Sequence, residues 1–221
     1  MRRRGKQVIL VFHGLGVPHQ RVREEEIPYW ATEERFTEIV DEVAALRERG
    51  RDIRLTFDDG NRSDLTLGAP ILASRGICAE FFVLAGRLSD DEYLSPDNIA
   101  SLIDMGMSIG LHGRNHDDWS TLTPMDLRSE TVAARTELEA IAGVPVTKVS
   151  IPFGRYNRRT ISHLKSLDFQ VIYTSDGGPT RPDARVKART SIRSDMTNQT
   201  IRDVLDGKEP LKRSIRRLLS K

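Results

Sequence analysis

Two adjacent aspartates, Asp58 and Asp59, follow a short apolar segment and precede Gly60. Consecutive residues of a strand point in opposite directions, so both carboxylates can face one site only at a turn, which the glycine permits. Two carboxylates this close resist simultaneous ionisation unless a cation neutralises one of them. The pair is therefore predicted to combine a metal ligand with a base. The alternative is an Asp-Asp-Gly turn with a capping carboxylate.

Two histidines, His112 and His116, follow another apolar segment at a spacing of four residues. This spacing brings two imidazoles together across one turn, as a metal ion requires. The alternative leaves His112 at a strand end and His116 solvated in a loop. Together with the aspartates, the histidines predict a site of two histidines and one carboxylate with open positions. Zn²⁺ is the expected metal, and iron, cobalt, nickel or manganese would also suit these ligands.

These side chains need a scaffold that brings several strand ends together. Short β-branched segments alternate with longer helical patterns, among them helices over residues 32–49, 125–142 and 157–167 and one that starts at Ser95-Pro96. The predicted strands are Gln7–Phe12, Asp52–Phe57, Cys78–Leu84, Met107–Leu111, Thr147–Ile151, Gln170–Tyr173 and Ala188–Ile192. The pattern indicates an α/β fold with a parallel sheet, either doubly wound or closed into a barrel. About seven strand–helix units in a single domain favour a (β/α)7-type barrel.

Polar segments follow five of the predicted strands. They are His13-Gly-Leu-Gly16, Asp58-Asp-Gly-Asn61, His112-Gly-Arg-Asn-His116, Pro152-Phe-Gly-Arg155 and Ser175-Asp-Gly-Gly178. In parallel α/β folds the active site lies at the carboxyl ends of the strands, which these segments occupy. Because His, Asp and Gly are common in loops, one such segment would mean little, but several together predict a shared site.

Three motifs in this order, Thr56-Phe-Asp-Asp-Gly60, His112-x-x-x-His116 and Pro152-Phe-Gly154, resemble the polysaccharide deacetylases of carbohydrate esterase family four. The resemblance runs from about Val8 to about Asp195. The resemblance implies a deformed (β/α) barrel as the fold. It implies the removal of N- or O-acetyl groups from glycans as the activity.

The segments Phe12-His-Gly-Leu-Gly16 and Tyr29-Trp30 are most similar to the branch of the family that acts on poly-N-acetylglucosamine-type exopolysaccharides. Position by position, the resemblance implies Asp58 as the general base. It implies metal ligation by Asp59, His112 and His116.

The resemblance also bears on the general acid. Most of the family uses a histidine late in the chain, but no histidine follows His163 here, and His163 lies in a predicted helix. The exopolysaccharide branch uses a histidine after its first strand, which matches His13, and a barrel brings its first and last strands together. His19, further along the same loop, is expected to be solvated.

The sequence departs from the family pattern at two positions. Ser150 stands where the family usually has an arginine that orients the catalytic aspartate, and Arg155 or Arg189 could replace that arginine. Gly113 stands where the family has Ser or Thr after the first metal histidine. Both departures bear on rate and substrate more than on metal binding.

Substrate contacts are expected near the Pro152-Phe-Gly154 motif. A backbone N–H near Phe153 is a candidate second donor to an oxyanion, and Phe153 and Trp119 are candidates for an apolar slot around the acetyl methyl. For Trp119 the alternative is a core aromatic. The remaining candidates for substrate or oxyanion contact are Pro152, Gly154 and Asp176.

The charge of the chain is unevenly distributed. Its 221 residues carry a formal charge of +2, but residues 1–6 hold four basic groups and residues 208–221 hold six against Glu209 alone. Residues 7–207 therefore form an acidic body of net charge −7. Because a nucleic-acid-binding domain concentrates Lys and Arg on its folded body, nucleic acid is not an expected partner. We predict a basic tail (1–6), a catalytic domain (7–207) and a basic amphipathic segment (208–221).

One cysteine, Cys78, excludes an intramolecular disulfide and is interpreted as a buried structural thiol. No stretch approaches the ~18 apolar residues of a membrane span. The apolar segment Val8–Phe12 is too short for a signal peptide, so we expect a cytoplasmic protein. The C-terminal segment could lie on an anionic membrane, but a terminal helix that closes the barrel is the favoured alternative.

The candidate metal site and the resemblance to the polysaccharide deacetylases together predict a metal-dependent hydrolase that removes acetyl groups, N-acetyl first, from a glycan or oligosaccharide. One alternative is a glycan-binding or regulatory protein on an inactive scaffold of the same kind, which Ser150 and Gly113 favour. Another is an amidase of the same architecture that acts on a small molecule.

Overall fold

A computed structural model describes residues 5–208 of the chain. Apart from Lys208, the predicted amphipathic segment 208–221 lies outside the described residues, as do residues 1–4 of the predicted tail 1–6. The main sheet is wholly parallel, with the order β10-β1-β4-β5-β6-β7-β8-β9. Its strands are β1 (Gln7–Phe12), β4 (Asp52–Phe57), β5 (Glu80–Val83), β6 (Ser108–Leu111), β7 (Lys148–Ser150), β8 (Val171–Thr174), β9 (Val186–Ala188) and β10 (Thr190–Ser191).

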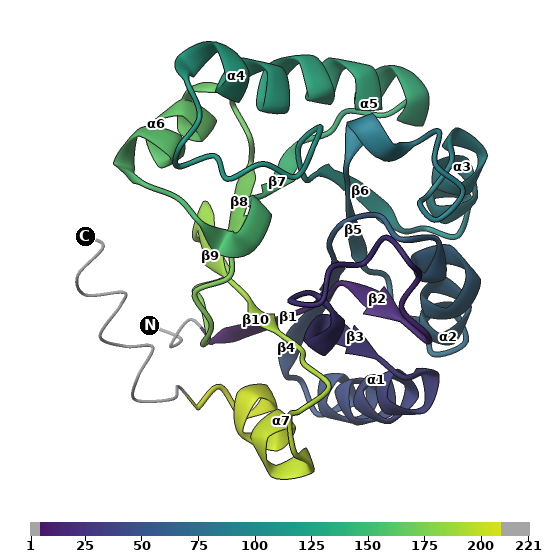
Figure 1. Ribbon diagram of the computed structural model, residues 1–221. Coiled ribbons are helices and arrows are strands. Elements are labelled where there is room, and N and C mark those ends of the chain that lie inside the picture. The colour runs from purple at the N-terminus through teal and green to yellow at the C-terminus, as the bar shows by residue number, and fades with distance from the viewer. Residues whose placement is uncertain (1–4, 209–221) are drawn as a thin grey trace.

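The sheet curves into a barrel because one segment joins its two ends. β9 and β10 are separated by Arg189 alone; β9 pairs with β8, and β10 pairs with β1 at Leu10↔Thr190 and Val11↔Ser191. Counted as one strand, this segment makes seven around a nearly closed, deformed barrel (Figure 1). The prediction of a (β/α)7-type barrel in a single domain is confirmed, and the doubly wound alternative is wrong.

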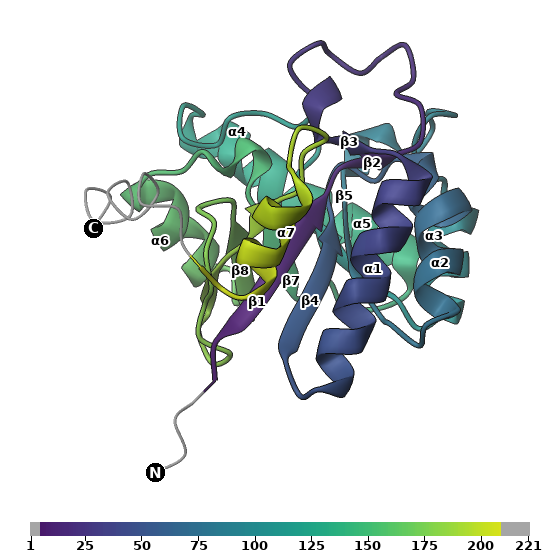
Figure 2. The same ribbon diagram turned by 90° about the horizontal axis from the view of Figure 1, so that it is seen from below.

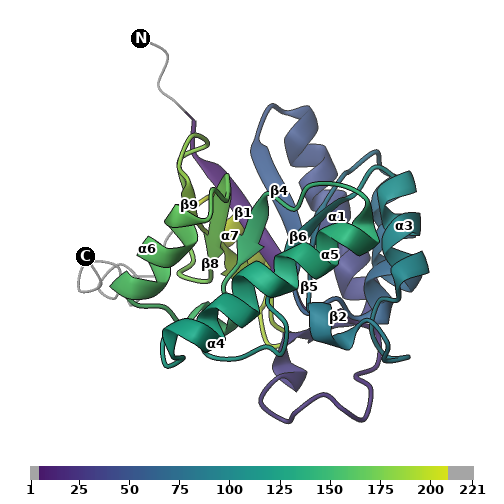
Figure 3. The same cartoon turned by 90° about the horizontal axis from the view of Figure 1, so that it is seen from above.

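The helices lie outside the sheet and begin largely where the sequence predicted. They are α1 (Glu33–Glu48), α2 (Ala69–Ala73), α3 (Pro96–Asp104), α4 (Pro124–Arg128), α5 (Ala134–Ala142), α6 (Arg158–Ser166) and α7 (Asn198–Leu205). The side chains of Thr32, Ser95 and Thr123 cap α1, α3 and α4. A π-helical turn over residues 129–133 joins α4 to α5, and the two run end to end (Figure 3). α2 lies between two predicted strands where a helix was expected without a stated range, whereas α7 was not predicted.

A group of phenylalanines fixes the first strands of the barrel. Phe12 of β1 packs edge-on against Phe36 of α1, with ring centroids 4.9 Å apart, and Phe57 of β4 stacks on Phe81 of β5 at 4.6 Å. All four rings are fully buried. Aromatic pairs of this kind contribute about 0.5–1.5 kcal/mol each beyond the area they bury. They hold the carboxyl ends of β1 and β4, where His13 and Asp58 follow.

A two-stranded sheet that the sequence did not predict stands beside the barrel mouth. It pairs β2 (Gly14–Leu15) with β3 (Trp30–Ala31). Gly14 is required there, because a Cβ at this position would lie 2.3 Å from the Trp30 ring. The loop between the two strands, purple in Figure 2, projects from the body of the molecule.

Two predictions about single residues are wrong. Cys78 is exposed, because β5 begins only at Glu80 and the buried neighbours Ile77 and Ala79 take the inward positions on either side of it. His19 is half-buried rather than solvated: its ring lies edge-on to those of Trp30 and Tyr93, with centroids 5.5 and 5.4 Å away. Its Nε2 also lies 3.1 Å from Asn61 Oδ1. Within residues 5–208, no helix has the length and apolar character needed to cross a membrane.

Candidate functional site

Asp59, His112 and His116 meet at the carboxyl ends of β4 and β6. Asp59 Oδ1 lies 3.4 Å from His112 Nε2 and 3.3 Å from His116 Nε2. One possible ligand atom from each of the three residues lies within 4.8 Å of the other two. The structure thus brings together the carboxylate and the two imidazoles that the sequence predicted as metal ligands.

Left-handed backbone conformations place two of these side chains. Asp59 has φ +77° and His116 has φ +64°, values that non-glycine residues seldom adopt. Such conformations persist only where the surrounding structure imposes them, and they concentrate at functional sites. The turn at Asp59 and Gly60 lets two consecutive aspartates approach one site, as the sequence predicted.

The hydrogen bonding of the three residues suits a metal cation. His112 Nδ1 donates to the Ser150 carbonyl at 3.0 Å, which leaves the Nε2 lone pair directed at Asp59. Asp59 Oδ1 is buried and has no hydrogen-bond partner among the described residues. A carboxylate oxygen and two imidazole nitrogens form a donor set for a divalent transition metal, so these residues fit the expected ion.

The electrostatics of the three residues support the same fit. Burial lowers the pKa of His116 to about 4 despite the nearby Asp59 carboxylate, so its nitrogens are free of an extra proton at neutral pH. Burial would raise the pKa of Asp59, but His116 and His112 hold it well below its usual value. For His112, burial is outweighed by Asp58 and Asp59, and its pKa is raised. The two carboxylates thus favour a positive charge beside His112, whether this charge is a proton or a metal ion.

Asp58 lies beside this cluster, with its Oδ2 3.8 Å from His112 Nε2, and it is held there by a hydrogen-bond network of its own. Arg189 Nη1 donates to its Oδ1 at 2.7 Å and Arg189 Nη2 to its Oδ2 at 2.6 Å. Ser150 Oγ also donates to Oδ2, at 2.9 Å. Burial would raise the pKa of Asp58, but Arg189 and His112 lower it, so the carboxylate is ionised at neutral pH.

Arg189 therefore binds Asp58 in place of the arginine that the family pattern has at position 150, and the Ser150 hydroxyl binds the same carboxylate. Of the two candidates that the sequence offered, Arg155 is exposed and lies 3.5 Å from Asp118, whereas Arg189 is fully buried. Arg189 lies at the junction of β9 and β10, with its guanidinium carbon 5.4 and 5.3 Å from the ring centroids of Phe82 and Tyr173. The strand that closes the barrel thus carries the partner of Asp58.

His13 follows β1 and lines the cavity at the barrel mouth. Its ring centroid is 5.0 Å from that of Tyr29, and its Nδ1 is buried with no hydrogen-bond partner in the described part of the chain. Burial lowers the pKa of His13, although Asp59 and Asp58 oppose that shift. The pairing of β1 with β10 places His13 beside the last strand. His163, by contrast, lies on α6, with its Nε2 2.8 Å from Thr131 Oγ1.

The cavity above the cluster has a volume of about 1140 Å³ and is lined by His13, Asp58, Asp59 and His116, among others. Among the candidates for substrate contact, Phe153, Gly154 and Asp176 line this cavity.

The Phe153 ring covers His116, with centroids 4.2 Å apart. Asp176 Oδ2 accepts hydrogen bonds from Tyr156 at 2.8 Å and from Thr174 at 2.9 Å. Pro152 is buried beside Phe153 and does not line the cavity. Trp119 is fully buried and does not line it either, and its indole N–H lies 3.4 Å from Glu130 Oε2. Trp119 is therefore the core aromatic of the alternative interpretation.

The loop between β2 and β3 supplies a part of the cavity wall that the sequence did not predict. Glu26 Oε1 lies 4.0 Å from His116 Nδ1, and Arg23 lies over the Phe153 ring at 5.4 Å.

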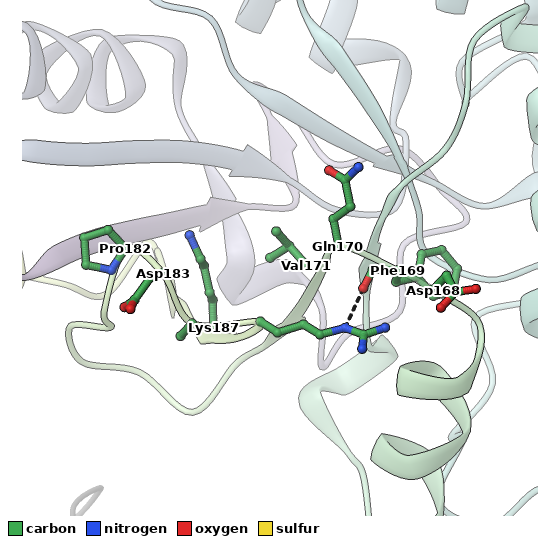
Figure 4. Close-up of a pocket in the computed structure, with 9 residues that line it drawn as sticks. Asp168, Phe169, Gln170, Val171, Pro182, Asp183 and Lys187 are labelled. Atoms are coloured by element: carbon green, nitrogen blue, oxygen red, sulfur yellow. Dashed lines mark hydrogen bonds between the residues drawn. The ribbon is translucent and has the colours of Figure 1, made fainter.

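A smaller hollow of about 440 Å³ lies at the opposite, amino-terminal ends of β8 and β9 (Figure 4). There Arg185 Nε donates to the Phe169 carbonyl at 2.7 Å. This second hollow contains none of the predicted site residues.

Comparison with known proteins agrees with this geometry. A family model described as polysaccharide deacetylase matches residues 46–172, which include Asp58, Asp59, His112, His116 and Ser150. The chain belongs to the polysaccharide deacetylase family. His13 and Arg189 of this family member lie outside the matched range.

Individual relatives share the family and the fold. A chitin deacetylase of a Pestalotiopsis species is 30% identical over 118 residues, which are 53% of this chain and 39% of that protein. YxkH of Bacillus subtilis, whose name assigns it to the same family, is 25% identical over 141 residues, or 64% of this chain and 50% of that protein. This polysaccharide deacetylase family member therefore spans about half the length of its curated relatives, or less.

Solved structures show the same fold. The deacetylase PplD of Streptococcus pyogenes superposes with a TM-score of 0.76 and 20% identity, covering 94% of this chain and 100% of that one. IcaB of Ammonifex degensii superposes with a TM-score of 0.74 and 20% identity, covering 94% and 99%. The deformed barrel of the polysaccharide deacetylases is thus the fold of this chain.

Proposed function

We propose that this protein is a metal-dependent deacetylase that hydrolyses acetyl groups, N-acetyl first, on a glycan or oligosaccharide. One observation carries the proposal: Asp59, His112 and His116 converge to within 4.8 Å, while Asp58 is held beside them by a buried arginine. A ligand cluster next to an independently oriented carboxylate provides both a metal site and a base at the floor of one cavity.

Asp59, His112 and His116 would hold the metal, and Zn²⁺ is the first candidate. A divalent metal bound there would polarise the acetyl carbonyl and acidify a bound water. The carboxylate of Asp58 accepts the proton of the attacking water. Arg189 keeps this carboxylate ionised and fixes both of its oxygens, so the base is oriented before substrate arrives.

His13 is the proposed general acid. Amide hydrolysis expels an amine, which leaves readily only when its nitrogen is protonated. His13 lines the same cavity as Asp58, and burial lowers its pKa, which makes its imidazolium a stronger acid toward that amine. Because its pKa lies below the usual value of about 6.5, His13 must take up a proton from solvent before that step.

Phe153 has two proposed roles. Its backbone N–H is the candidate second donor to the oxyanion, since Phe153 adopts φ +57° in the turn that follows β7 at the edge of the cavity. Phe153 is 40% exposed, and its ring, tilted over that of His116, offers an apolar surface for the acetyl methyl. Gly154 and Asp176 are the proposed further substrate contacts.

Two contacts argue against an inactive scaffold. Ser150 lacks the guanidinium of the family arginine, but Arg189 supplies one to the same aspartate. Gly113 lacks the family hydroxyl, but the loop that it opens is bound by Glu130. The features that favoured a binding or regulatory protein therefore have replacements that support catalysis.

Acetate release tests the proposal. Chelator-treated protein is reloaded in turn with Zn²⁺, Co²⁺, Ni²⁺, Mn²⁺ and Fe²⁺ and assayed on N-acetylated chito-oligosaccharides, an O-acetylated sugar and a small N-acetyl amide. We expect metal-dependent acetate release, fastest on the N-acetylated oligosaccharides. Preferential hydrolysis of the small amide would favour the amidase alternative. Absence of acetate release from every substrate with every metal would refute the proposal.

A further inference from the structure

The loop 113–115 connects the two histidines of the candidate metal centre, and its backbone is held on two sides. On one side, the carbonyl oxygens of Gly113 and Arg114 accept hydrogen bonds from the N–H groups of Ala85 and Gly86, at 2.9 and 3.0 Å. A Cβ at Gly86 would lie 2.7 Å from the Arg114 carbonyl. This side is therefore a close backbone contact with the segment that follows β5.

On the other side, one carboxylate binds the loop. Glu130 Oε2 accepts a hydrogen bond from Arg114 N–H at 3.0 Å, and Oε1 accepts one from Asn115 N–H at 3.0 Å. The Trp119 indole N–H approaches Oε2 at 3.4 Å. Only 2% of Glu130 is exposed, so these bonds form away from water, where a hydrogen bond is electrostatically stronger than at the surface.

Two local features allow Glu130 to reach the loop. Glu130 lies in the π-helical turn between α4 and α5, and such turns within helices often occur at functional sites. Gly113 has φ +100°, and a Cβ at this position would lie 2.6 Å from Glu130 Oε2. The glycine thus leaves the space that the carboxylate occupies.

We propose that Glu130 is a positioning residue of the metal centre, because its carboxylate fixes the loop 113–115 and thereby the geometry of the two histidine ligands. The inference rests on the proposed metal-dependent function. Ligands must stay within about 0.5 Å of the productive geometry. His116 also holds a left-handed backbone conformation at the end of this loop, which requires support from its surroundings.

Metal affinity of the Glu130→Gln variant tests the proposal. Glutamine keeps the size of the side chain but presents an amide group to two backbone N–H donors. The dissociation constant for Zn²⁺ is measured by competition with a chromophoric chelator, and the geometry of the site is read from the absorption spectrum of the Co²⁺-loaded protein. We expect affinity to fall about 10- to 100-fold and the Co²⁺ spectrum to change.

Glu137→Gln is the matched control. Glu137 is on the same helical run and bonds the guanidinium of Arg114, but it is 39% exposed and does not touch the backbone of the loop. The affinity of the Glu137→Gln variant for Zn²⁺ should stay within about twofold of that of wild type. An equal loss in both variants would overturn the proposal, because it would point to a general effect of charge on this helix.

Gly113→Ala provides an independent variant in case Glu130→Gln fails to fold. Its methyl group displaces the carboxylate from the loop while Glu130 itself is retained, so Zn²⁺ affinity should again fall about 10-fold or more. If wild type, Glu130→Gln and Gly113→Ala all bind Zn²⁺ equally tightly and have the same Co²⁺ spectrum, the role of Glu130 is refuted and the proposed function stands. If wild type binds no divalent metal, the proposed function and this inference both fail.

Discussion

Replacing Arg189 with methionine removes the guanidinium from Asp58 while keeping an unbranched apolar side chain among Phe82 and Tyr173. Wild type has two charge-assisted hydrogen bonds here, 2.7 and 2.6 Å long, between side chains that are 0% and 2% exposed. Hydrogen bonds to charged groups contribute about 1.5–3 kcal/mol each, and removing one partner of a buried pair costs about 3–5 kcal/mol. We therefore expect the free energy of unfolding to fall by about 3–5 kcal/mol.

Activity should fall as well, because Asp58 loses the partner that fixes its two oxygens. A displacement of a catalytic group by about 1 Å lowers the rate on the order of 100-fold, which is the expected fall in kcat. Urea unfolding of chelator-treated protein measures the stability, and acetate release by the metal-loaded protein measures the activity. Arg189→Lys, which keeps the charge but not the paired donors, should lie between methionine and wild type.

Arg155→Met is the control, because Arg155 is exposed and the carboxylate of Asp118 lies 3.5 Å from its guanidinium. The unfolding free energy of Arg155→Met should stay within about 0.5 kcal/mol of wild type.

A second test places the guanidinium at position 150 instead of position 189. The double variant Arg189→Ser with Ser150→Arg should recover part of the activity that Arg189→Ser alone loses. Full stability and full activity in Arg189→Met would refute the role given to Arg189.

Three further changes test other parts of the site. Asp64 is fully buried with no partner for either carboxylate oxygen among the described residues, and burial, with Asp59 and Asp58, raises its pKa well above the usual value. Because the pKa of Asp64 is higher in the folded protein than in the unfolded chain, where it is about 3.9, Asp64 destabilises the folded protein increasingly as the pH rises above 3.9. Asp64→Asn should therefore stabilise the chelator-treated protein at pH 7 but not near pH 4. Asp91→Asn on the surface is the control, and a gain of equal size at both pH values would contradict the argument. His13→Ala should slow amide hydrolysis by about 10²–10⁴-fold but that of an activated ester far less, and equal losses would remove His13 from the acid role. Phe153→Ala should raise KM for an N-acetylated oligosaccharide about 2- to 10-fold in steady-state assays, and an unchanged KM would show that its ring does not contact substrate.

The sequence predicts well those features that are encoded locally. Strands β1 and β4 begin and end at the predicted residues, because β1 is mostly apolar, apolar residues alternate with polar ones in β4, and polar residues or glycines follow both. The candidate metal ligands could be found from two short motifs whose spacing is itself the geometric signal. The expectation that His13 lies beside the last strand depended only on closure of the barrel.

Contacts between distant segments could not be predicted in the same way. Arg189 reaches Asp58 across 131 positions of the chain, so the sequence could name it only as one of two candidates, together with Arg155. Glu130 reads as one acidic residue on a helix, and only the π-helical turn and the space at Gly113 direct it toward the loop. Cys78 was misplaced because an apolar segment does not reveal where its strand begins.

The most direct test of the central claim is acetate release by Asp58→Asn, measured together with its metal content. Asparagine keeps the shape of Asp58 but cannot accept the proton of the attacking water, and Asp59, His112 and His116 remain intact. We predict one divalent metal per chain in both proteins and a rate for the variant about 10²–10⁴-fold below that of wild type on an N-acetylated oligosaccharide. Wild-type activity in Asp58→Asn, or wild-type protein that turns over without any metal, would contradict the account.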